Sequence, residues 1–133
     1  MHHSTQKHKL TEYLHGVYNV LRERGYIQST PYEFQKKWVN NSYERGVNLI
    51  GIDLLYAVIM KNNDRIIGIR DRIRVNFAGN IEAFLNADGY IQGKVKKTTH
   101  GFAGQAWEML EKLKNNDMQY FENLYKKIIQ EKK

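Results

Sequence analysis

Two short runs of basic side chains are the residues of this sequence best suited to chemistry. The arginines of the first run alternate with other residues, and the lysines of the second have no acidic neighbour: Arg70, Arg72 and Arg74, then Lys94, Lys96 and Lys97. Guanidinium and ammonium groups bind phosphates, and a folded positive face attracts a nucleic acid by releasing its counterions. We therefore expect these six residues to contact a nucleic-acid backbone.

A further set of candidates lies on a predicted helix over residues 31–45. Its start is signalled by Thr30-Pro31-Tyr32-Glu33, which supplies a capping hydroxyl, a proline at the first helical position and a glutamate three residues past the cap. Asparagine, glutamine and lysine side chains can read base edges in a major groove. The helix carries several of them and is the expected recognition helix: Gln35, Lys36, Lys37, Asn40 and Asn41.

Four other residues could take part in a reaction, but each has a simpler structural interpretation. His100 precedes a predicted helix and could act as a general base, although nothing nearby in the sequence orients it. Asp53 lies in an apolar run where burial could raise its pKa, yet it also forms a polar stripe with Lys61 at helical spacing. Glu108 and Glu111 suit the wet face of an amphipathic helix better than a metal site.

The composition narrows the classes of function. The 133 residues include no cysteine, which excludes disulfides, thiolate zinc sites and cysteine nucleophiles. No phosphate-binding loop, dinucleotide fingerprint or zinc-protease helix is present, so we expect no cofactor, no metal site and no catalytic residue. This absence is weak evidence against an enzyme, because catalytic groups can be assembled in space. With no apolar stretch of membrane length and no secretion signal, we expect a cytoplasmic protein.

Apolar spacing predicts a mainly α-helical fold that positions these groups. We expect one domain over residues 1–133, with about five helices and with residues 1–8 able to fray at the terminus. Gly25 and Gly46 are expected to end the first two helices. The helical segments indicated by the pattern are 5–24, 31–45, 49–60, 81–88, 102–115 and 118–131.

Two segments leave an α+β alternative open. Residues 65–77 fit a helix, but their β-branched content favours a strand, which would place Arg70, Arg72 and Arg74 on one face. Residues 90–99 suggest a strand or a small hairpin with Gly93 near its turn. A small sheet or hairpin could therefore accompany the helices.

Two functions compete. The first is a small basic protein that binds nucleic acid without catalysis, as a phage or mobile-element regulator does; its basis is the net charge of +7 from 21 basic and 14 acidic side chains. The second is a protein-interaction module, such as an inhibitor, adaptor or assembly component. Its basic surface, rich in tyrosine, would dock on an acidic or nucleic-acid-associated partner.

Overall fold

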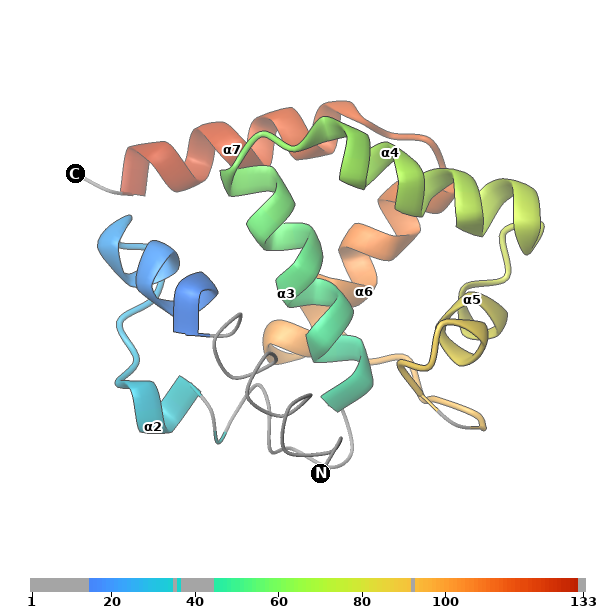
Figure 1. Cartoon of the computed structure of the whole chain (residues 1–133), viewed down its shortest axis with the longest axis horizontal. Helices are drawn as coiled ribbons and strands as arrows, with labels where there is room; N and C mark the ends of the chain where they lie inside the picture. The colour runs from blue at the N-terminus through green and yellow to red at the C-terminus, as the bar shows by residue number, and fades with distance from the viewer. Residues whose placement is uncertain (1–14, 35, 37–44, 92, 132–133) are drawn as a thin grey trace, which may run out of the picture.

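The computed structural model describes residues 15–34, 36, 45–91 and 93–131 of the chain (Figure 1). Residues 15–23 are helical, and the elements after them are α2 (Pro31–Phe34), α3 (Arg45–Ile59), α4 (Asn63–Asp71), the π-helix η2 (Arg72–Asn76), α5 (Ile81–Ala87), α6 (Gly101–Lys114) and α7 (Gln119–Glu131). No strand occurs in these ranges, which confirms the mainly α class. Seven labelled helical elements replace the expected five or so.

None of the helices in this described part is long and apolar enough to cross a membrane.

The apolar helix α3 runs through the centre of the molecule and packs most extensively against α6 (Figure 1). Gly51 permits this close crossing, because a Cβ at that position would stand 2.6 Å from the Cβ of Ala106 and 2.9 Å from the ring of Phe102. The core residues form one cluster to which the helix at 15–23 and every labelled element contribute. Trp107, Leu110 and Leu113 of α6 all belong to it.

Local signals place several helix ends where the sequence predicts them. Gly25 has a φ of 77° and ends the first helix, with the Tyr26 amide donating to the Leu21 carbonyl at 2.9 Å. Asn80 caps α5 by accepting from the Ala83 amide at 3.0 Å. The expected role of Gly46 is wrong: this residue lies inside α3, where a Cβ would be 2.0 Å from the Tyr90 carbonyl oxygen.

The predicted capping box at the start of α2 is confirmed. The Glu33 amide donates to the Thr30 hydroxyl at 3.2 Å, and the Thr30 amide donates to the Glu33 carboxylate at 2.9 Å. Hydrogen bonding of the Glu33 carboxylate to Thr30, to its backbone foremost and then to its side chain, lowers the pKa of Glu33 below its ordinary value of 4.5. Of the rest of the helix expected over 31–45, residues 35 and 37–44 lie outside the described residues, Lys36 is described, and Arg45 is the first residue of α3.

The strand favoured over residues 65–77 is wrong, because this stretch is helical through α4 and η2. Ile66, Ile69 and Ile73 are buried at helical spacing, and they form a stripe that points to the core. The alternation expected of a strand fails at Ile67 and Val75, which are exposed. Asn62 fixes the start by accepting from the Arg65 amide at 3.2 Å.

Candidate nucleic-acid interface

The helical course of residues 65–77 gives each of the three candidate arginines a partner inside the protein. Arg70 pairs with Asp71 at 2.9 Å and donates to the Asn116 side chain at 3.1 Å. Arg74 donates to the Lys114 carbonyl, the last of α6, at 2.7 Å. These two arginines join α4 and η2 to the end of α6 and the turn after it, and their predicted contact with phosphate stays a prediction.

Arg72 points elsewhere and joins η2 to α5. Its guanidinium forms an ion pair with Asp88 and lies 5.6 Å from the ring centre of Phe77 and 6.0 Å from that of Phe84. Such cation–π contacts stabilise a fold by about 0.5–1 kcal/mol at exposed sites. The alternating arginines therefore do not form the continuous ridge that a strand would have given.

The three candidate lysines lie on the connection between α5 and α6, which we call the lysine segment (residues 93–99). The Asn86 side chain holds its start: the amide nitrogen donates to the Gly93 carbonyl at 3.0 Å and the oxygen accepts from the Gly93 amide at 2.9 Å. The Val95 amide donates to the Glu82 carboxylate at 3.0 Å. Side chains of α5 thus hold this segment where a hairpin would have its second strand. No strand forms in the described residues of 90–99, so the strand or small hairpin suggested by the sequence is not found there.

The other end of the lysine segment is fixed against α6. Gly104 lies so close to the loop that a Cβ there would stand 2.4 Å from the carbonyl carbon of Thr99. The carbonyl of His100 accepts from the Gly104 amide at 2.9 Å, which begins the helix. The segment is therefore held at both ends by short contacts with two different helices.

The lysines differ in their surroundings. Lys94 and Lys96 are exposed on either side of the half-buried Val95, and neither has a carboxylate within ion-pair distance among the residues placed by the structure. Lys97 pairs with Glu111 on α6 at 3.6 Å. The segment thus presents two lysines that have no acidic partner among the described residues, and a third that pairs with α6.

The lysine segment borders an open hollow of about 560 Å³, which we call the α6 hollow. Three loop residues line one side of the hollow: Lys97, Thr98 and Thr99. Residues of α6 line the other side: Gln105, Trp107, Glu108 and Glu111. A second hollow of about 320 Å³ shares Gln105 and Glu108 and continues to Tyr26 and to Tyr120 on α7. Both hollows follow the same face of α6.

Hydrogen bonds order the face of α6 shared by these two hollows. Gln105 donates its amide N–H to the Tyr26 hydroxyl at 2.6 Å, and the Tyr120 hydroxyl donates to Glu108 at 3.1 Å. Burial raises the pKa of Tyr120, and the nearby Glu108 carboxylate raises it further. The tyrosine therefore stays protonated as a donor throughout the neutral range.

The remaining candidates of the expected recognition helix divide in two. Lys36 is exposed, and its ammonium lies 5.9 Å from the ring centre of Tyr32. Gln35, Lys37, Asn40 and Asn41 lie outside the described residues. The structure thus brings together the lysine segment and the face of α6, while most of the expected recognition helix lies outside the described residues.

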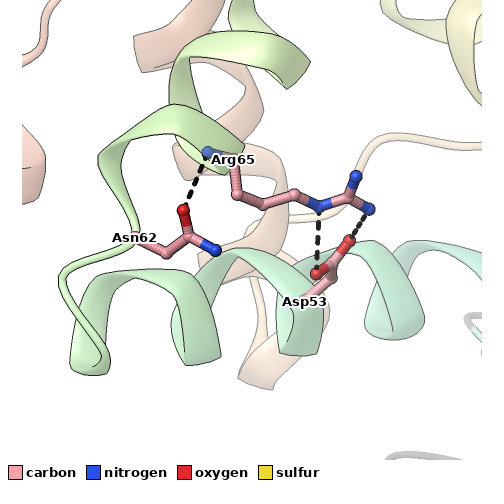
Figure 2. A network of polar contacts seen from close by, with 3 residues as sticks. All are labelled: Asp53, Asn62 and Arg65. Atoms are coloured by element: carbon pink, nitrogen blue, oxygen red, sulfur yellow. Dashed lines mark hydrogen bonds and ion pairs between the residues drawn. The ribbon is translucent and has the colours of Figure 1, made fainter.

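Asp53 has a structural partner of its own. Figure 2 shows the Arg65 guanidinium lying against the Asp53 carboxylate, with contacts of 2.5 and 3.4 Å, while Asn62 caps the same turn of α4. This ion pair joins α3 to α4. Asp53 therefore serves the packing of two helices, and its place in a polar stripe with Lys61 stays a prediction.

His100 is the residue before α6, and its exposed side chain makes no capping hydrogen bond. Its backbone amide donates to the Thr98 hydroxyl at 3.2 Å. Within the described ranges no group of three His, Cys, Asp or Glu side chains is arranged to hold a metal ion. The histidine thus contributes backbone geometry to the end of the lysine segment.

Sequence reasoning misses the residues that hold and extend this surface. Asn86 holds the start of the lysine segment, and Gln105, Tyr26 and Tyr120 come together from three regions of the chain. The spacing of Glu82 and Asn86, one helical turn apart on α5 and followed by a short link, is the one signal that could have indicated the contact.

No family model, no curated protein and no solved structure matches this chain.

Proposed function

We propose that this protein binds nucleic acid without catalysis, through the lysine segment and the adjoining face of α6. The observation that carries the proposal is the pair Lys94 and Lys96, exposed on a segment that Asn86 and Gly104 hold at its two ends. A cationic side chain on a fixed backbone loses less freedom on binding than one on a loose tail. The net charge of +7 adds long-range attraction for a polyanion.

Fluorescence anisotropy with a labelled single strand and a labelled duplex, over a series of salt concentrations, tests this proposal. Each phosphate contact contributes about 0.7 to the slope of log affinity against log salt for a single strand and about 0.9 for a duplex. Replacing Lys94 and Lys96 by alanine should therefore reduce the slope for a single strand by about 1.4.

A charge-matched control separates a local contact from a loss of net charge. The double variant Lys114→Ala/Lys126→Ala removes two exposed lysines from α6 and α7 and should leave most of the slope unchanged. Equal effects of both pairs would overturn the assignment to the lysine segment, since only total charge would then matter. No complex with either probe in dilute buffer would overturn the proposed function.

A protein-interaction module is the second candidate, and a different surface favours it. A largely apolar hollow of about 210 Å³ lies between α4 and α7, lined by Ile66, Ile67, Met118 and Phe121, and also by the charged residues Lys61, Arg70 and Glu122. Exposed Ile67 beside such a hollow is a feature of protein-binding surfaces. If this surface binds a protein, Ile67→Glu should abolish the stoichiometric complex with that protein partner, a complex that survives nuclease treatment. The affinity for oligonucleotides should stay unchanged.

A further inference from the structure

The hollow between α4 and α7, which we call the α4–α7 hollow, has the size of a pocket for one side chain. Its volume of about 210 Å³ lies below the roughly 300–1,000 Å³ of pockets that enclose a whole small ligand. An apolar cavity of about 150 Å³ already accepts one benzene ring. The α4–α7 hollow therefore suits a single aromatic or branched aliphatic group presented by a larger molecule.

The apolar part of the lining supports that use. Ile66 and Phe121 are buried, whereas Ile67 is 37% exposed and Met118 is half-buried. A ring that entered the hollow would cover apolar surface of Ile67 that now faces water. The flexible thioether side chain of Met118 can adapt to the shape of that ring. Pockets of this kind at protein interfaces receive one anchor residue of the partner.

Lys61 brings a cation to this hollow from an unfavourable backbone position. It follows α3 with a φ of 54°, a conformation that favours glycine. The Lys61 amide donates to the Val58 carbonyl at 3.1 Å. The Asn62 amide donates to the Ala57 carbonyl at 2.8 Å, which completes a Schellman motif. Glycine would adopt this turn at a lower conformational cost, so the turn itself gives no reason for a lysine.

Both cations of the lining have capacity for an anion. The Lys61 ammonium lies 4.6 Å from the ring centre of Tyr125, and no described carboxylate lies within ion-pair distance of it. Arg70 pairs with Asp71 through Nη2 at 2.9 Å and donates from Nη1 to Asn116 at 3.1 Å. Each terminal nitrogen of a guanidinium carries two N–H groups, so each keeps one N–H beyond these contacts.

The two cations lie at opposite ends of α4. Lys61 precedes the helix and Arg70 lies in its last turn, and the nine residues of α4 extend over about 13 Å at a rise of about 1.5 Å each. Residues eight positions apart on a partner helix are separated by about 12 Å. A helix lying along α4 could therefore place a carboxylate near each cation and an apolar side chain midway. Glu122 is the one carboxylate among the described lining residues, so the charges there favour an acidic ligand.

We propose that the α4–α7 hollow docks an amphipathic helix of an acidic protein partner. One aromatic or leucine side chain of that helix enters the hollow, and the residues four positions before and after it are Asp or Glu, which meet Lys61 and Arg70. Binding through an apolar anchor on one helix face is a common way to recognise a helix in a groove. This inference rests on the second candidate function, the protein-interaction module, and specifies the chemistry of its partner.

Three synthetic alanine-rich helical peptides of about 17 residues test this pattern. Each has a central phenylalanine, and the residues four positions to either side are both glutamate, both glutamine or both lysine. At low salt we expect the glutamate peptide to bind about threefold more tightly than the glutamine peptide and about tenfold more tightly than the lysine peptide. Replacing the phenylalanine by alanine should weaken binding about tenfold, because burial of the ring is lost. NMR titration measures each affinity and follows the methyl signals of Ile67.

Variants of Lys61 separate binding from folding. Lys61→Gln removes the charge and should weaken the glutamate peptide about threefold, whereas Lys126→Gln, on an exposed residue of α7 outside the lining, should keep the affinity. Lys61→Gly should weaken binding as well, yet leave the melting temperature unchanged or higher, because glycine suits the positive φ. Ala78→Gly is its control, since Ala78 has a φ of 51° outside the hollow. It should raise the melting temperature without changing the affinity.

Glu122→Gln should have the opposite effect on binding. It removes the carboxylate of the lining, so the glutamate peptide should bind about twofold more tightly and the lysine peptide more weakly. A loss of affinity for the glutamate peptide in this variant would contradict the assigned charges.

The outcomes separate this inference from the function on which it rests. Equal binding of the three peptides, weakened in each case by the uncharged variant Ile67→Asn, would overturn the acidic partner and leave the protein-interaction module intact. A preference for the glutamate peptide that survives Lys61→Gln unchanged would also overturn the inference, since the carboxylates would be bound elsewhere. If no peptide shifts the Ile67 signals, or if Ile67→Asn affects none of them, the site and the second candidate function are both overturned.

Discussion

The backbone of Thr99 passes so close to Gly104 that position 104 has no room for a side chain: a Cβ there would stand 2.4 Å from the Thr99 carbonyl carbon and 2.6 Å from its oxygen. Atoms at that distance would have to move, and because the obstructing atoms are backbone atoms, the loop or the first turn of α6 would have to shift. The close approach sets where the lysine segment meets α6.

Gly104→Ala should therefore destabilise the protein by about 1–3 kcal/mol, because forced overpacking outweighs the gain in helix propensity. Gly68→Ala is the matched control, since Gly68 also lies within a helix but has nothing within 4 Å of an added Cβ. It should stabilise by about 0.5–1 kcal/mol. Urea unfolding measures both changes, and a neutral Gly104→Ala would show that the loop yields freely.

Arg72 should matter more for stability than for binding. Arg72→Ala removes the Asp88 ion pair and the contacts with Phe77 and Phe84, so we expect a loss of about 1–2 kcal/mol in the free energy of unfolding. Arg72→Lys should recover only part of this, because a lysine lacks the planar guanidinium. The salt slope of oligonucleotide binding should change less in Arg72→Ala than in Lys94→Ala/Lys96→Ala. A larger change in Arg72→Ala would instead indicate that Arg72 contacts the nucleic acid.

The capping box predicts a pH dependence at the acidic end. Because the hydrogen bonds from Thr30 lower the pKa of Glu33, its ionised form stabilises the folded state above the ordinary value of 4.5. This contribution is lost as the pH falls through the lowered pKa. NMR titration of the Glu33 carboxyl should give a midpoint below 4.5, and Thr30→Ala should move it upward. In Glu33→Gln the corresponding part of the pH dependence of unfolding should vanish.

Tyr120 predicts the opposite behaviour at the alkaline end. Its burial, and then the Glu108 carboxylate, raise its pKa above the ordinary value of 10, so the folded state holds this proton more tightly than the unfolded chain. The resulting stabilisation is complete below pH 10 and declines as the pH rises further. Tyr120→Phe should weaken that alkaline decline in the free energy of unfolding. Glu108→Gln should lower the pKa of Tyr120, measured by NMR of its ring carbons.

The mainly helical fold could be predicted because most segments carry agreeing local signals. The start of α5 combines a capping Asn80 with inward Phe84 and Leu85, and the structure shows both features. The prediction for residues 65–77 failed because isoleucine is common in strands, whereas burial of Ile66, Ile69 and Ile73 together decides for a helix. Tertiary packing overrides propensity where the two disagree.

Of the residues in the candidate site, only the lysines could be predicted from the sequence. Runs of charge are visible in a sequence, but their partners are not, so the internal contacts of Arg70, Arg72 and Arg74 could not be seen before the fold. The same limit applies to the hydrogen bond between Gln105 and Tyr26, which joins residues 79 positions apart. The spacing of residues in a sequence indicates which of them share one face of a helix or strand, but it does not indicate which distant elements pack together.

The double hydrogen bond between Asn86 and Gly93 has a consequence for self-association. If the lysine segment were paired with a strand, the two would form a small sheet with an open edge. The unpaired backbone N–H and C=O groups of such an edge can bind a strand of another molecule. Here the Asn86 side chain makes two hydrogen bonds to the backbone of Gly93, as one residue pair of a sheet would, and this pairing is limited to Gly93. Because exposed lysines follow it directly, we expect a second copy of the protein to be repelled at this loop, as charged side chains on sheet edges discourage the pairing of strands between molecules.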